Sequence, residues 1–132
     1  MHTVDRIKIA KRLNQYRPEN KPPLNICIQI NISQESSKSG IHINDLDAFI
    51  DEIGEFERLS VRGLMALPAP ANNLLEQRWP FAELRTHFEA LNEKTPALDT
   101  LSIGTSQDIE AAIAEGATIV RIGTAIFGPR HA

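Results

Sequence analysis

Two similar segments near the end of the chain carry the clearest pattern, TLSIGTSQD at residues 100–108 and ATIVRIGTAIFG at residues 117–128. Each is typical of a short apolar strand followed by a turn of small residues, and a helix can begin after each turn. Ser106 is predicted to cap the first helix, with Asp108 in its first turn. Backbone N–H groups at such turns bind anions. The segments therefore predict one phosphate site between two neighbouring turns, as after the last two strands of a (β/α)8 barrel.

Four residues of these segments are candidates for binding the ligand: Ser106, Arg121, Gly123 and Thr124. Gly123 and Thr124 repeat, after the second strand, the arrangement around Ser106. Arg121 lies in an otherwise apolar strand, where an unpaired charge is costly, so it is expected to point into a site or to meet a carboxylate. The alternative is a helix cap at Ser106, a simple turn at Gly123 and an ordinary ion pair at Arg121. Because the two turns occur together, we favour the binding interpretation.

Helices and strands alternate along the rest of the sequence. Apolar periodicity predicts helices over residues 5–16, 45–57 and 74–94, and strands over 24–32, 59–67, 98–103 and 118–122. Asn44 is expected to cap the second helix, and Pro80 to kink or break the third near Trp79, which is expected in the core. Residues 2–4 read as a possible strand end. The order predicts an α/β fold with parallel strands, as a single domain over residues 1–132.

Composition narrows the function classes. With 132 residues, 42% of them hydrophobic, and a net charge of −3, the chain resembles an ordinary globular domain without the basic face of a nucleic-acid binder. Its apolar runs are far shorter than the ~20 residues that span a membrane, and its histidines show no metal-ligand spacing. One cysteine, Cys27, lies in an apolar strand and is expected to be buried and inert. We therefore expect a cytoplasmic protein without nucleic-acid, membrane or metal partners.

Four blocks resemble the pyridoxal phosphate homeostasis protein family, whose members are relatives of the alanine racemase barrel. They are HTVDRIKIAKRLN (2–14), PPLNICIQINISQESSKSGI (22–41), VRGLMALPAP (61–70) and LDTLSIGTSQDIEAAIAEGATIVRIGTAIFG (98–128). The resemblance implies a partial (β/α)8 TIM-type barrel of the alanine racemase N-terminal-domain kind, from about strand 4 or 5 to strand 8. It also implies binding of pyridoxal 5′-phosphate (PLP) and a non-catalytic role in vitamin B6 homeostasis.

The resemblance also implies a role for individual residues. Ser106, in the S-x-G-x-S block, would hold the PLP phosphate, and Gly123 and Thr124, in R-I-G-T, would add backbone and hydroxyl contacts. Arg121 would face the pyridine nitrogen and keep it unprotonated, which weakens the ring as an electron sink. Lys38, in the S-K-S-G loop, would lie near the barrel mouth and attract the cofactor. Considered without the resemblance, the loop is a weak match to a Walker phosphate-binding motif, because the first glycine of that motif is missing. The default interpretation of Lys38 is therefore a solvated loop lysine.

Several blocks of the family pattern are not found in this sequence. They include the A-V-S-K segment with the Schiff-base lysine, G-E-N-Y-V-Q and H-x-I-G-x-L-Q-x-N-K. The five lysines are all expected in helices or loops: Lys8, Lys11, Lys21, Lys38 and Lys94. The resemblance therefore implies a truncated member that holds PLP non-covalently at most and has no catalytic residue.

Three alternatives stay open. In the first alternative, the chain is a structural half-barrel. It would work by joining another chain, or by self-association through its exposed strand edges, which favour pairing. It is a fragment without function of its own. Or it is a PLP-dependent racemase-like enzyme, which would need a catalytic base on each face of the cofactor, and no pair of residues fills those roles.

Overall fold

The computed structural model describes residues 1–36, 38–94 and 98–131. Three parallel strands form a sheet in the order β1 (Leu24–Ile30), β2 (Leu59–Ala66) and β3 (Thr100–Ser102). The helices are α1 (Ile7–Tyr16), α2 (Leu46–Ile53), α3 (Leu74–Lys94), α4 (Ile109–Ala114) and α5 (Thr124–Phe127), and the 3-10 turn η1 (Ile43–Asp45) leads into α2. Each pair of neighbouring strands is joined by a helical crossover, which confirms the predicted α/β fold with parallel strands.

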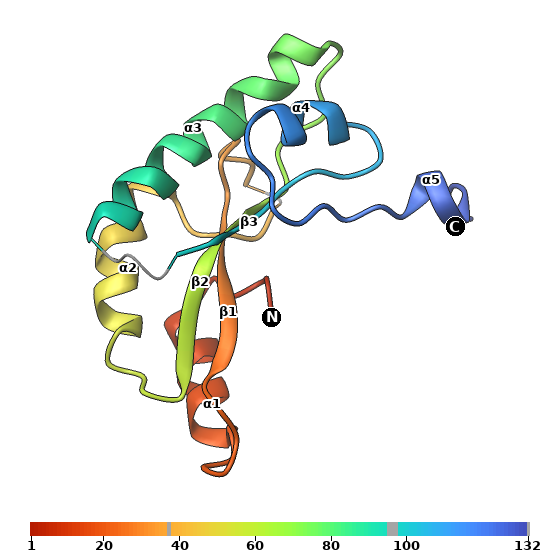
Figure 1. Ribbon diagram of the computed structural model, residues 1–132. Helices are drawn as coiled ribbons and strands as arrows, with labels where there is room; N and C mark the ends of the chain where they lie inside the picture. Colours follow the sequence, from red (N-terminus) through yellow and green to blue (C-terminus); the bar gives the residue numbers. More distant parts are fainter. Residues whose placement is uncertain (37, 95–97, 132) are drawn as a thin grey trace.

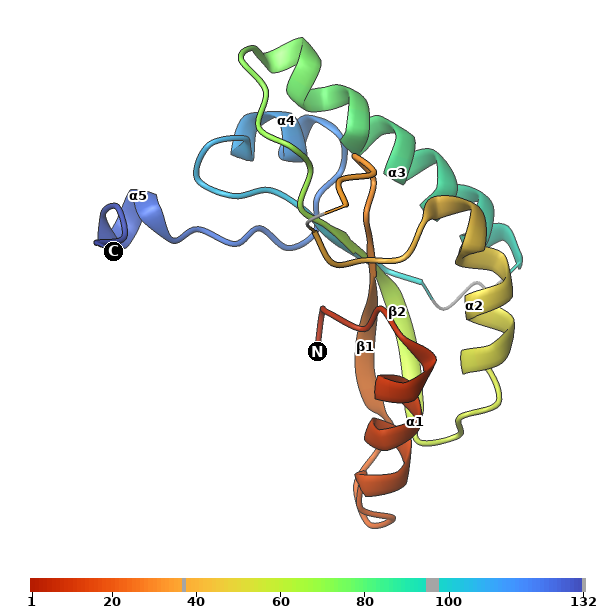
Figure 2. The same ribbon diagram turned by 180° about the vertical axis from the view of Figure 1, so that it is seen from behind.

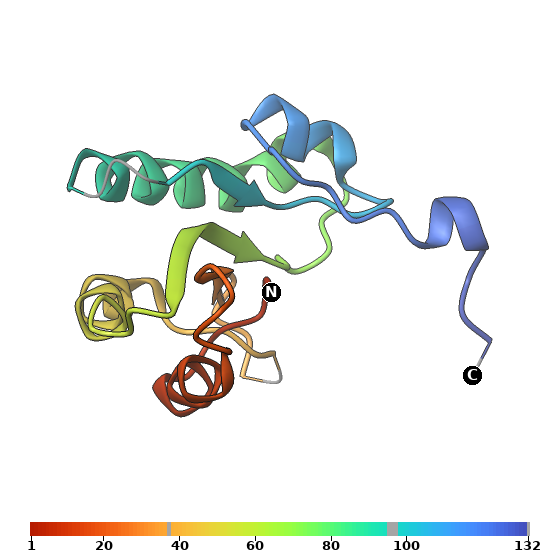
Figure 3. The same ribbon diagram turned by 60° about the horizontal axis from the view of Figure 1, so that its bottom comes forward.

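Two further segments extend the sheet at its sides, and a third, at Ile41, forms a parallel bridge with Ile30 at the end of β1. Val4 forms a parallel bridge with Ile28 of β1, and Ile119 forms a parallel bridge with Ser102 of β3. Together with the three strands, they make five parallel segments side by side (Figures 1 and 2). Figure 3 shows α1, α2, α3 and α4 arranged in an arc around one face of this sheet. The arrangement is part of a (β/α)8 barrel, as predicted.

The main hydrophobic core lies between the sheet and this arc of helices. Ile26, Ile28 and Ile30 of β1 alternate along the strand and belong to this buried core. The residues between them, Cys27 and Gln29, point to the opposite face and are also buried. Burial on both faces explains why β1 is a nearly continuous apolar run. Burial also raises the pKa of the Cys27 thiol, which makes it a poor nucleophile at neutral pH.

Strand β2 has a β-bulge where it pairs with β1, and beside this bulge its backbone lies close to that of β3. The β1–β2 register shifts at this point, so that Ile26 pairs with Val61 and Cys27 pairs with Gly63, leaving Arg62 as the extra residue. A Cβ atom at Gly63 would overlap the carbonyl oxygen of Thr100. Glycine is therefore required sterically at position 63, whatever its backbone conformation.

The prediction of a strand over residues 118–122 is wrong, because the structure has no regular strand there. The segment is extended and hydrogen-bonded to β3, but Ile119 makes a single bridge rather than a ladder. Among the described residues it has a neighbour on one side only, so half of its backbone groups have no strand there to pair with. The other predicted strands are present but shorter, since β3 covers only Thr100–Ser102 of residues 98–103.

The predicted helix starts need two corrections. Asn44 does not cap α2, because η1 precedes the helix and Asp45 occupies its N-cap position without a side-chain hydrogen bond. His42 instead accepts a hydrogen bond at Nδ1 from the Asn44 N–H, at 3.1 Å. The first helix begins at Ile7 rather than residue 5.

The long helix α3 runs without a break through Pro80. Of the predicted kink or break, the break is therefore absent, and the buried side chains of Phe81 and Leu84 anchor the helix on the core directly after the proline. Trp79 was expected in the core but is 65% exposed. Among the described residues, we find no helix with the length and hydropathy needed to cross a membrane.

Candidate functional site

The turns that follow β3 and the 118–122 segment are held together by a hydrogen bond. Ser106 lies in the turn after β3, and its Oγ accepts a hydrogen bond from the backbone N–H of Ala125, in α5, at 3.0 Å. The predicted meeting of the two turns is thus present at this point. Ser106 does not cap α4, however. Asp108 occupies that N-cap position, and its carboxylate accepts hydrogen bonds from the Thr105 N–H at 2.7 Å and the Thr105 hydroxyl at 3.1 Å.

Gly123 and Thr124 present backbone donors next to Ser106. Gly123 is the N-cap of α5, and its carbonyl accepts hydrogen bonds from the Ile126 and Phe127 N–H groups at 2.9 and 2.8 Å. The N–H groups of Gly123 and Thr124 have no hydrogen-bond acceptor in the described part of the chain. Both residues are exposed. This turn therefore offers two N–H groups and a hydroxyl to a ligand that approaches from solvent.

Arg121 connects the ends of two strands instead of meeting a carboxylate. Its guanidinium donates hydrogen bonds to the carbonyl of Ala66, where β2 ends, at 3.1 Å, and to that of Ser102, where β3 ends, at 3.2 Å. No ion pair of Arg121 occurs within the described residues, and its buried Nε has no hydrogen-bond partner there. Burial lowers the pKa of Arg121, and the charge of Asp108 partly opposes this effect. Arg121 thus lies at the carboxyl ends of the strands, where ligands bind in parallel α/β folds.

Two residues near Arg121, His2 and Ser102, were not among the site residues predicted from the sequence. His2 places its Nδ1 3.0 Å from the Ser102 hydroxyl, although the two residues are 100 positions apart. Burial lowers the pKa of His2, and the charge of Arg121 contributes to this shift. Alternation along β3 does place Ser102 on the face opposite the core, but no local pattern indicated that residues 1–4 would lie within reach of it.

The lysine expected near the barrel mouth lies in a loop after β1. Lys38 is exposed, and its ammonium forms an ion pair with the carboxylate of Glu35, at 3.2 Å. Ser37, in the same S-K-S-G segment, lies outside the described residues. The other four lysines are also exposed, and all five lie in helices or loops, as the sequence predicts. Within the described ranges, no group of three or more His, Cys, Asp or Glu residues is arranged to hold a metal ion.

The chemistry of these groups fits a ligand that combines a phosphate with a heteroaromatic ring. A phosphate is bound by hydroxyl and backbone N–H donors, which Ser106, Gly123 and Thr124 supply. A guanidinium such as that of Arg121 donates hydrogen bonds but cannot give up its proton, so it matches an unprotonated ring nitrogen.

Comparison with known proteins supports the partial-barrel fold described above. The family model of the alanine racemase N-terminal domain matches residues 1–131. The pyridoxal phosphate homeostasis protein of Escherichia coli (strain K12) is 53% identical over 129 residues, which cover 98% of this chain and 55% of that protein. The protein of the same name from Pseudomonas aeruginosa is 52% identical over 130 residues, with the same shares. The chain thus spans about half the length of these relatives.

Two solved structures are similar over nearly the whole chain. PipY of Synechococcus elongatus PCC7942, solved with PLP bound, has a TM-score of 0.83 and 32% identity, covering 96% of this chain and 59% of PipY. A crystal structure of an unknown protein from Bifidobacterium adolescentis has a TM-score of 0.86 and 32% identity, covering 96% of this chain and 51% of the other. With the family model matching almost every residue, the chain belongs to the family of the alanine racemase N-terminal domain.

Proposed function

We propose that this chain binds PLP non-covalently and serves in pyridoxal phosphate homeostasis, the role for which its relatives are named. The observation that carries the proposal is the hydrogen bond between the Ser106 hydroxyl and the Ala125 N–H, which joins the two turns at 3.0 Å. This bond places the Ser106 hydroxyl beside the start of α5, where Gly123 and Thr124 lie, so we infer that the donors of the two turns serve one ligand. PipY, a structural neighbour, was solved with PLP bound.

In this proposal each site residue has a distinct task. The hydroxyl of Ser106 and the N–H groups of Gly123 and Thr124 bind the phosphate. Arg121 orients the ring by donating to the pyridine nitrogen, and the carbonyls of Ala66 and Ser102 hold its guanidinium in place. When bound, PLP supplies an aldehyde and a ring that acts as an electron sink. A permanent cation at the ring nitrogen opposes protonation of that nitrogen, so this site suits binding better than catalysis.

The lysines favour non-covalent binding. An imine with PLP requires a lysine amine at the aldehyde, and all five lysines of this chain are exposed and lie outside the strands. Two of the three proposed phosphate contacts, Gly123 and Thr124, are exposed as well, so we expect weak and reversible binding. We therefore infer a non-enzymatic protein, and we place it in the cytoplasm, where the buried free thiol of Cys27 stays reduced.

Spectroscopy combined with borohydride reduction tests this function. PLP is added to the full chain, absorption is recorded, and the sample is reduced with borohydride and analysed by mass spectrometry after digestion. The proposal predicts a free-aldehyde spectrum for the bound cofactor and no preferred lysine among the reduced adducts. A stable adduct on one specific lysine would contradict the proposal, because it would show a covalent site.

A further inference from the structure

The turn that carries Ser106 is closed by a carboxylate that has no part in the proposed phosphate contacts. Asp108 accepts hydrogen bonds at Oδ1 from the Thr105 N–H at 2.7 Å and from the Thr105 hydroxyl at 3.1 Å. In the opposite direction, the Asp108 N–H donates to the Thr105 carbonyl at 3.3 Å. The three bonds join the residue before Ser106 to the residue two positions after it, so they hold the intervening backbone in a closed turn.

Both ends of this turn are fixed to the rest of the fold. At its start, the Gly104 carbonyl accepts a hydrogen bond from the Arg121 N–H at 2.9 Å. Gly104 has a φ of +100°, and a Cβ atom there would lie 2.6 Å from the Cβ of Ala112 in α4, so this close packing requires glycine. At the end of the turn, the Asp108 carbonyl accepts from the Ala112 N–H at 3.0 Å. With both ends fixed, the bonds between Asp108 and Thr105 decide the path of the two residues between them.

Asp108 also decides which hydroxyl of the turn is available to a ligand. Thr105 and Ser106 are adjacent, half-buried residues that each carry a hydroxyl. A hydroxyl has one O–H to donate, and that of Thr105 is donated to Asp108. The Ser106 hydroxyl instead accepts from the Ala125 N–H at 3.0 Å, which leaves its own O–H for a ligand. The turn therefore offers the hydroxyl of Ser106 and withholds that of Thr105.

The negative charge of Asp108 does not itself favour a phosphate. Asp108 is half-buried and forms no ion pair within the described residues, and like charges repel more strongly away from bulk water. What the side chain contributes to the turn is an acceptor oxygen. An asparagine at this position would offer the same kind of oxygen without the charge, so acceptor and charge can be tested separately.

We propose that Asp108 is a positioning residue for the phosphate of the bound ligand. By accepting both donors of Thr105, it holds the Ser106 hydroxyl at the place from which it meets α5 and the phosphate. Asp108 itself contacts neither the phosphate nor the ring. The proposal rests on the PLP binding proposed above and adds that the preference of the site for a phosphorylated ligand depends on Asp108.

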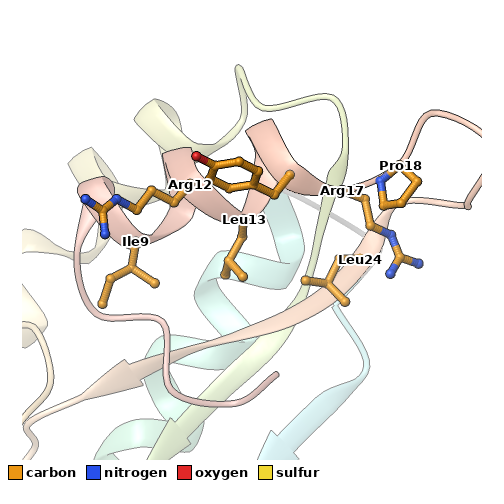
Figure 4. A pocket seen from close by; sticks show the side chains of 7 residues that line it. Ile9, Arg12, Leu13, Arg17, Pro18 and Leu24 are labelled. Carbon is orange, nitrogen blue, oxygen red and sulfur yellow. The ribbon is translucent and has the colours of Figure 1, made fainter.

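A groove on the outer side of α1 is another place where an anionic aromatic ligand could bind, and the test has to separate the two. Figure 4 shows that it combines apolar side chains with Arg12 and Arg17. Its lining includes Leu24, the first residue of β1, so it lies toward the amino ends of the strands. Asp108 follows the carboxyl end of β3, at the opposite end of the sheet. Removal of Arg12 therefore affects binding in the groove and not binding in the turn.

Titration calorimetry of the full chain with PLP, and with pyridoxal, which lacks the phosphate, tests the proposal. We expect Asp108→Ala to weaken PLP binding by about tenfold, the equivalent of one lost hydrogen bond, and to leave pyridoxal binding unchanged. Asp108→Asn keeps the acceptor oxygen, so its PLP affinity stays within about threefold of the original. Two controls leave both affinities unchanged: Glu110→Ala, which removes an exposed carboxylate from α4, and Arg12→Ala, which alters the groove.

Circular dichroism shows whether each variant is folded. If Asp108→Ala is not, Thr105→Val takes its place, because it removes the hydroxyl donor to Asp108 and is expected to weaken PLP binding by about threefold with pyridoxal binding unchanged.

Three results would overturn the proposal. One is PLP binding that the substitution leaves unchanged. Another is an equal loss of PLP and pyridoxal binding, which would show a general effect on the fold. The third is a loss in Asp108→Asn as large as that in Asp108→Ala, which would assign the effect to charge. Failure of the proposed function is a different result, namely no saturable PLP binding by the original chain, or binding that Arg12→Ala abolishes.

Discussion

The hydroxyl of Ser106 accepts a hydrogen bond from the backbone N–H of Ala125 at 3.0 Å, across 19 positions of the chain. This bond joins the turn after β3 to α5, which otherwise extends away from the body of the molecule (Figure 1). The hydroxyl of Ser106 also has an O–H group that can donate, and we assign this donor to the phosphate of the ligand.

Replacing Arg121 by alanine is expected to lower the free energy of unfolding by about 1–3 kcal/mol, because the carbonyls of Ala66 and Ser102 lose a charged donor. Arg121→Lys recovers part of this loss, since an ammonium keeps the charge but reaches the two carbonyls less well. Urea denaturation measures both variants. Arg130→Ala, at an exposed position near the end of the chain, is the control and changes stability by less than about 0.5 kcal/mol. Equal effects at the two positions would contradict the assigned role of Arg121.

Glu115 links α3 to α4, and its removal is expected to loosen this contact. Its buried carboxylate forms ion pairs with Arg78 at 2.8 Å and with Arg85 at 3.2 Å. Because both arginines are partly exposed, we expect Glu115→Gln to cost about 1–2 kcal/mol, less than breaking a fully buried pair. Thermal or urea unfolding measures the change. The exposed Glu110→Gln, on the same helix, should be nearly neutral, and a neutral Glu115→Gln would show that the pairs contribute nothing.

Gly63→Ala is expected to destabilise the fold by about 1–3 kcal/mol, because its new Cβ would overlap the backbone carbonyl of Thr100 and force β3 away from β2. Gly123→Ala is the matched control, since a Cβ there meets no atom within 4 Å. We expect this control to stay within about 0.5 kcal/mol of the original protein. Unfolding curves of the two variants provide the comparison, and a stable Gly63→Ala protein would argue against the close approach of the strands.

His2 makes stability depend on pH. Burial lowers its pKa below the ordinary value of 6.5, which the unfolded chain retains, so the unfolded state binds a proton more readily than the folded state. The contribution of His2 is therefore complete above about pH 6.5 and is lost as the pH falls through the lower pKa of the folded state. His2→Gln should remove this part of the pH dependence, while His131→Gln, at an exposed position, should retain it. Urea denaturation at several pH values between neutral and mildly acidic measures this dependence. An equal pH dependence of the His2→Gln and His131→Gln proteins would contradict the role of His2.

Sequence patterns predicted the alternation of helices and parallel strands because both faces of the sheet are buried, and burial leaves apolar periodicity in strands such as β1. They also placed Ser106, Gly123 and Thr124 in neighbouring turns. They missed the N-cap role of Asp108, because serine and aspartate cap helices almost equally well and both occur in the same turn. They missed His2 and Ser102, since contact between residues so distant in sequence depends on sheet order. The exposure of Trp79 escaped prediction because an aromatic residue at helical spacing usually marks a core face.

Equilibrium dialysis of PLP against the full chain tests the central claim most directly. We expect saturable binding, and we expect Ser106→Ala to weaken it by about tenfold, the equivalent of one lost hydrogen bond to a charged group. Ser60→Ala, near the amino end of β2 and so at the opposite end of the sheet, should bind PLP like the original chain. PLP retention that does not saturate, or that is equal in the Ser106→Ala and Ser60→Ala proteins, would contradict the claim that these turns hold the phosphate.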